Sequence, residues 1–139
     1  MKNLSLLICF ILLTTVAFAQ EQDLNETPQP PGPYMTFEED SHDFGDITQG
    51  DKVEFVFNFE NTGDTPLIIT NIKVTCGCTA TDWMREPIPP GEKSSITVKF
   101  NSTGKLHKQN KVITIVSNAS NPIPQVRIVA NVLPKEGDS

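Results

Sequence analysis

The stretch Lys52-Val53-Glu54-Phe55-Val56-Phe57-Asn58-Phe59-Glu60 decides the fold. Apolar side chains recur at every second position, so they lie on one face of an extended chain, and the polar side chains lie mostly on the other face. This pattern is typical of a β-strand with one face against a core. The run Asn-Thr-Gly-Asp-Thr-Pro at 61–66 is rich in turn-forming residues and is expected to end the strand.

The same period of two continues on both sides of this strand. Further alternating or β-branched segments, separated by turn-forming residues, lie at 35–37, 42–47, 67–74, 93–100, 111–116 and 125–133. The segment 67–74 has apolar residues on both faces, which predicts a central strand. No helical period occurs after the leader. About seven strands at near-regular spacing predict an immunoglobulin-like antiparallel β-sandwich over residues 34–133.

The first nineteen residues have the pattern of a signal peptide. Lys2 supplies a positive charge, an apolar run follows, and Ala17-Phe18-Ala19 is a small-x-small cleavage pattern. We therefore expect export, with a periplasmic or secreted product, and removal of Cys9 with the leader. Residues 20–33 are rich in proline and predict a disordered spacer, and residues 134–139 predict a disordered tail.

The charge of the chain limits its partners. The formal net charge is −6, and no cluster of basic residues is present. Nucleic acid and anionic lipid are therefore poor candidates, because both attract positive surfaces. We expect a protein partner whose identity the sequence does not reveal, and we predict no cofactor.

Cys76 and Cys78 are the cysteines expected in the exported chain. If both continue the strand that reaches Val74, they point to the same face with Cα atoms about 6.6 Å apart, at the limit of disulfide geometry. Four interpretations are open. The pair is structural, whether reduced or bridged; it is a labile redox disulfide; it binds a soft metal such as Cu(I) or Zn(II); or it bridges to another chain.

Four other residues complete the set of candidates. Trp83, the only tryptophan, is either a packing residue at the end of the sandwich or an exposed contact for a partner or glycan. His42 and His107 lack ligand spacing to the cysteines and are expected to be lone surface or turn residues. Met84 is a soft donor for copper or an apolar filler. No nucleophile–base set, phosphate-binding glycine loop or catalytic carboxylate pair is evident, so we predict no enzyme.

Five short motifs occur in one order and spacing. They are His42-Asp43-Phe44-Gly45, Asn61-Thr62-Gly63-Asp64, Cys76-Gly77-Cys78-Thr79, Ile88-Pro89-Pro90-Gly91 and Lys108-Gln109-Asn110-Lys111. In this respect the chain resembles the bacterial family called domain of unknown function 1573, from about Thr36 to Val132. The resemblance implies an immunoglobulin-like sandwich of exported bacterial proteins. It supplies no activity and assigns no role to the motif residues.

These observations predict a non-catalytic immunoglobulin-like module of the bacterial cell envelope or periplasm, for protein interaction or scaffolding. Such domains bind partners through end loops or by pairing an exposed edge strand with another chain. The expected edges are the segment around Phe44 and Ile47 and the strand from Val126 to Val132. The alternative is thiol redox chemistry or soft-metal binding through Cys76 and Cys78.

Overall fold

The computed structural model describes residues 28, 30–75 and 77–137, which form eight β-strands and no helix. The strands are β1 (Met35–Phe37), β2 (Ser41–Thr48), β3 (Lys52–Asn61), β4 (Ile69–Val74), β5 (Cys78–Thr81), β6 (Lys93–Asn101), β7 (His107–Ser117) and β8 (Gln125–Leu133). The predicted signal peptide 1–19 and residues 20–27 of the predicted spacer lie outside the described residues. In the described part of the chain, no helix has the length and apolar character needed to cross a membrane.

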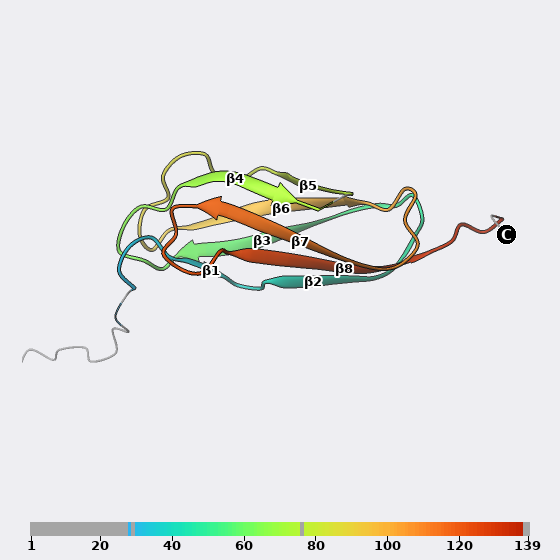
Figure 1. Cartoon of the computed structure of the whole chain (residues 1–139), viewed down its shortest axis with the longest axis horizontal. Helices are drawn as coiled ribbons and strands as arrows, with labels where there is room; N and C mark the ends of the chain where they lie inside the picture. The colour runs from blue at the N-terminus through green and yellow to red at the C-terminus, as the bar shows by residue number, and fades with distance from the viewer. Residues whose placement is uncertain (1–27, 29, 76, 138–139) are drawn as a thin grey trace, which may run out of the picture.

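The strands form two four-stranded sheets that pack face to face (Figure 1). Sheet A has the order β1-β3-β6-β5, and sheet B has the order β2-β8-β7-β4. The prediction of an all-β, immunoglobulin-like sandwich is confirmed. The described residues hold eight strands where about seven were expected, because β5 has only four residues, Cys-Thr-Ala-Thr, whose small apolar side chains give a weak strand signal.

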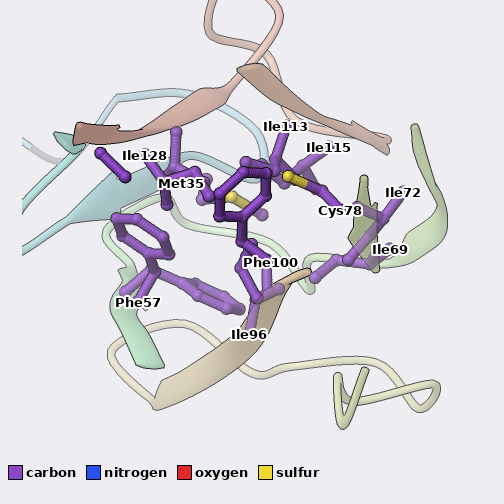
Figure 2. Close-up of a cluster of buried hydrophobic side chains, with 14 of the residues drawn as sticks. Met35, Phe57, Ile69, Ile72, Cys78, Ile96, Phe100, Ile113, Ile115 and Ile128 are labelled. Carbon is purple, nitrogen blue, oxygen red and sulfur yellow. The ribbon is translucent and has the colours of Figure 1, made fainter. Parts of the chain in front are cut away.

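The core lies between the sheets and is built from alternate residues of each strand. Phe57 and Phe59 of β3 are fully buried in one cluster with side chains of β6, from the same sheet, and of β8, from the other sheet. Figure 2 shows part of this cluster, with Phe57 and Phe100 from sheet A beside Ile113 and Ile128 from sheet B. Burying one such side chain contributes about 1.5–3 kcal/mol. The alternation predicted for the segments that form β3, β6 and β8 is confirmed. The buried residues of β6 and β8 occur at every second position and are Ile96, Val98, Phe100, Val126, Ile128, Ala130 and Val132.

One pair of strands is parallel, so the prediction of a wholly antiparallel sandwich is wrong in this detail. β2 pairs with β8 in parallel, from Ser41 opposite Arg127 to Thr48 opposite Leu133. The chain leaves β1 in sheet A and passes to β2 in sheet B over residues 38–40. Because this short link does not reverse the chain, β2 keeps the direction of β1 and meets β8 in parallel.

The strand β8 is central, so the prediction that residues 126–132 form an edge is wrong. β8 pairs with β2 on one side and with β7 on the other. The predicted edge around Phe44 and Ile47 is confirmed, because β2 is the first strand of sheet B. Within β2 it is Ile47 that is buried, whereas Phe44 is half-buried.

The strand β4 is an edge, so the prediction of a central strand for residues 67–74 is wrong. Its register with β7 shifts between Ile69 and Asn71, which is the signature of a β-bulge. Because the bulge adds one residue, the inward-facing side chains change from odd-numbered to even-numbered positions, and Ile69 and Ile72 are both buried. Ile68 and Val74 are exposed. The bulge, rather than burial of both faces, explains why apolar residues occur at odd and even positions.

Candidate functional site

The chain changes sheets between Val74 and Cys78, so Cys78 does not continue β4. β4 ends at Val74 in sheet B, and Cys78 begins β5 in sheet A. Gly77 has φ of 91°, a conformation that L side chains rarely adopt. A Cβ at Gly77 would lie 3.3 Å from both the Phe100 ring and the Lys105 side chain. Glycine is therefore required here for the tight change of direction, and the expected continuation of the strand from Val74 through Cys78 is wrong.

Cys78 belongs to the core. Its side chain is 8% exposed and lies in the same buried cluster as Phe100 and Ile115 (Figure 2). Cys76 lies outside the described residues, so the predicted disulfide, thiol and metal roles of the pair stay predictions. Among the described residues, no group of three or more histidine, cysteine, aspartate or glutamate side chains gathers in a way that could hold a metal ion.

The burial of Cys78 makes a kinetic prediction. In a Cys76→Ser variant of the mature chain, we expect iodoacetamide to modify Cys78 roughly a hundredfold more slowly in the folded protein than in concentrated guanidinium chloride, because modification needs local opening. Intact mass against time measures the rate. A Cys76→Ser, Cys78→Ala, Asn110→Cys protein is the control, because residue 110 is exposed. Rapid modification of Cys78 in the folded protein would contradict its place in the core.

Trp83 lies two residues after the end of β5 and packs against the core as a half-buried side chain. The guanidinium of Arg85 lies 3.7 Å from the ring centre, in cation–π geometry. The indole Nε1 is buried and is the one such side-chain atom among the described residues without a hydrogen-bond partner. Met84 between them is 46% exposed. A partner that stacked on this ring would therefore have to displace Arg85.

The two histidines differ in their surroundings. His107 is exposed, as expected. His42 is not a lone surface residue, because its ring stacks on Phe55 of β3 with centroids 3.7 Å apart and meets Phe44 edge-on at 4.7 Å. Its Nδ1 lies 3.3 Å from Glu39 Oε1. His42 and Phe44 are two residues apart on β2, so a period of two places both on the inward face, and this signal could have identified the pair.

The least protected backbone in the described structure lies along β3. β1 is only three residues long and pairs with residues 59–61 of the ten-residue β3. The last contact on that side is the hydrogen bond that Glu38 N donates to Asn58 O, at 3.0 Å. Because backbone groups alternate in direction along a strand, the N–H and C=O groups of Glu54 and Val56 also point to that side. No described residue pairs with them there, and we call residues 52–57 on this side the open edge.

Half-buried apolar side chains border the open edge. We call Phe37, His42, Phe44 and Phe55 the aromatic seam. His42 of β2 contacts Phe44 and stacks on Phe55 of β3, and Phe37 of β1 packs on Phe59 of β3. The His42 side chain is 28% exposed, and the three phenylalanines are partly exposed. On the outer face of the same stretch, Val56 is 44% exposed. An added strand would thus find apolar surface on its inward side and unpaired backbone along its length.

The other exposed edges of the two sheets are protected in ways that oppose strand addition. β2 has a register shift between Asp43 and Asp46 with Gly45 at φ of 69°, and β4 has its own bulge. β5 is four residues long. Bulges, charges and short length are the usual protections of natural sheet edges. The open edge of β3 lacks a bulge and continues in regular pairing with β6 from residue 52 to 60.

Comparison with solved structures places this architecture among immunoglobulin-like, PapD-like sandwiches. A protein of unknown function from Porphyromonas gingivalis W83 has a TM-score of 0.62 at 17% identity, over 78% of this chain and 51% of that one. The PapD-like domain 7 of human CEP192 has a TM-score of 0.58 at 10% identity, over 81% and 94%. The secreted serine protease VesC from Vibrio cholerae has 0.57 at 14%, over 72% and 23%. The chain thus spans about half of the first protein and a smaller part of VesC, and these similarities define the fold alone.

Within this class the chain belongs to the family described as protein of unknown function (DUF1573), which it matches over residues 35–132. The resemblance seen in the sequence motifs is confirmed. No curated protein matches the chain. The family description names no activity, and the similarity to solved structures gives the sandwich fold alone.

Proposed function

We propose that this domain is a non-catalytic protein-binding module of the bacterial cell envelope. The observation that carries the proposal is the open edge of β3, with its unpaired backbone at Glu54 and Val56 and the aromatic seam beside it. The leader pattern of residues 1–19 supports export. The sandwich fold and family membership fit a module that binds rather than converts its partner.

The physical basis of binding is strand addition. An unpaired sheet edge offers N–H and C=O groups whose hydrogen bonds with water can be exchanged for bonds to an extended peptide. Main-chain bonds supply affinity, and pockets for alternate side chains supply specificity. A strand seated on β3 would continue the line of β1, which ends at Phe37.

Site-specific photo-crosslinking in the source bacterium tests the proposal. A photo-reactive phenylalanine analogue replaces Glu54 at the open edge, Thr70 on β4, Thr79 on β5 or Asn110 on β7, four exposed positions on different strands. We expect a discrete adduct from Glu54 in the envelope fraction, and a product mass that lacks residues 1–19. Adducts from none of the four positions would count against a binding module, and retention of the full-length chain in the cytoplasm would count against export.

A further inference from the structure

The negative charge of the chain is concentrated beside the open edge. Residues 38–54 hold seven carboxylates and one lysine, a formal charge of −6 that equals the charge of the whole 139-residue chain. The formal charges of all the remaining residues therefore sum to zero. This segment comprises the link from β1 to β2, all of β2, and the start of β3. The charge follows the two strands that flank the aromatic seam.

Four of the seven carboxylates form no ion pair with a described residue, and Glu39 has only the His42 ring as a basic neighbour, at 3.3 Å. Glu38 lies 3.5 Å from Lys93, and Glu54 lies 3.8 Å from Lys99, both as exposed pairs. Asp43 Oδ1 accepts a hydrogen bond from Gly45 N, and Asp46 Oδ1 accepts one from Asn131 Nδ2, each at 2.8 Å. Neither aspartate forms an ion pair with a lysine or arginine among the described residues. The approach to the open edge is therefore negatively charged.

We infer that the open edge of β3 binds an extended segment of a partner protein in which apolar residues alternate with lysine or arginine. This inference rests on the proposed function and adds the chemistry of the partner. Inward side chains of that segment would pack on Phe55 and Phe44, and outward side chains would lie beside Glu54 on the outer face of sheet A. Opposite charge both attracts the segment and excludes acidic strands.

The dimensions of the edge limit the segment. Residues 52–57 correspond to a strand of about 20 Å, so about six partner residues suffice. Antiparallel pairing would use the N–H and C=O groups of Glu54 and Val56. A second copy of this chain is a poor occupant, because pairing two open edges would bring two segments of charge −6 together.

Backbone amide shifts of the isotope-labelled exported chain test the inference with a defined probe. The probe is a short synthetic peptide that alternates lysine with valine and phenylalanine, and its control has glutamate at every lysine position. We expect the lysine peptide to shift the Glu54 and Val56 amides and slow their hydrogen exchange, and the glutamate peptide to leave both unchanged. Added salt should weaken binding. Shifts confined to other strands, or equal binding of both peptides, would overturn the inference.

A proline substitution locates the interaction. The Val56 N–H points away from β6, so Val56→Pro removes no bond of the β3–β6 ladder. Ala80→Pro is the matched control, because β5 forms the opposite edge of sheet A and the Ala80 N–H also points away from β6. This direction follows from the hydrogen bond that Asn101 N donates to Gly77 O, since backbone groups alternate in direction along a strand. We expect Val56→Pro to weaken peptide binding roughly tenfold or more and Ala80→Pro to leave it within about twofold. Equal losses would overturn the inference.

A second measurement does not depend on the folding of a variant. Two N-methylated peptides are compared, one methylated at the odd residues and one at the even residues, so that each lacks the backbone N–H donors of one side. One of these peptides should fail to bind the unaltered protein, and the other should still bind. Retention by both would overturn strand addition. This test is separate from that of the proposed function. If crosslinked adducts form in cells but the lysine peptide does not bind, only the inference of a cationic partner segment is rejected. If no adducts form at any position, the proposed binding module is rejected.

Discussion

Asn61→Ala is expected to lower the free energy of unfolding by about 3 kcal/mol, because the side chain is fully buried and makes four hydrogen bonds. Its Nδ2 donates to Thr65 O at 2.8 Å and to Ile88 O at 2.9 Å. Its Oδ1 accepts from Tyr34 N at 3.3 Å and from Gly63 N at 3.1 Å. Alanine would remove these partners from Tyr34 N, Gly63 N and Thr65 O, whereas Ile88 O would keep the hydrogen bond from Leu67 N. Each backbone group left unsatisfied in a buried site costs about 1–3 kcal/mol.

Urea unfolding measures this loss, and two variants isolate its cause. Asn58→Ala, on an exposed position of the same strand, should change the free energy of unfolding by no more than about 0.5 kcal/mol. Asn61→Asp keeps the size of the side chain but loses both donors, so it should be at least as destabilising as alanine. A stable Asn61→Asp protein would show that volume rather than hydrogen bonding matters at this position.

Gly63→Ala is expected to cost about 2–3 kcal/mol for a steric reason. A Cβ on Gly63 would run into the carbonyl oxygen of Gly32 and lie 2.6 Å from the backbone nitrogen of Tyr34. Segment 32–34 is tied to this turn by hydrogen bonds from Asp64 N to Gly32 O at 3.0 Å and from Thr62 N to Tyr34 O at 2.8 Å. The added methyl group would therefore push the segment away and break these bonds.

Chemical denaturation together with amide exchange tests this prediction. The Asp64 amide should exchange faster with solvent in Gly63→Ala than in the unaltered protein, while the rest of the main chain stays folded. Gly91→Ala is the comparison, since Gly91 has φ of 78° and open space around it, so its cost reflects backbone strain alone, about 1 kcal/mol. Unchanged exchange at Asp64 would contradict the steric explanation.

Both predictions give physical reasons for the Asn-Thr-Gly-Asp motif, which the sequence identified only as a turn. Asn61 joins three backbone segments that are far apart in sequence, at Tyr34, Thr65 and Ile88. Gly32 and Pro33, at the end of the predicted spacer, bond to this part of the domain and to Ser120 N. A turn pattern predicts a change of direction, but it does not show which distant segment of the same chain packs against the turn.

The candidate site was predictable only in part. The sequence identified β2 as an edge, and its acidic residues are visible in the order of the chain. The open edge of β3 was missed, because it exists only where β1 ends early and the chain changes sheets at residues 38–40. The cysteine pair attracted attention through its chemistry, whereas the structure places Cys78 among core side chains.

The sequence by itself determined the segments of every strand except β5, which residues of β3, β6 and β8 face inward, and where negative charge gathers. These properties are local, since a period of two and the charge of a segment are set by neighbouring residues. Only the tertiary structure decided the sheet order, the parallel β2–β8 pair, the bulge in β4 and the open edge of β3. Those features depend on pairings between residues far apart in the chain, which are selected by the packing of the whole sandwich rather than by any one segment.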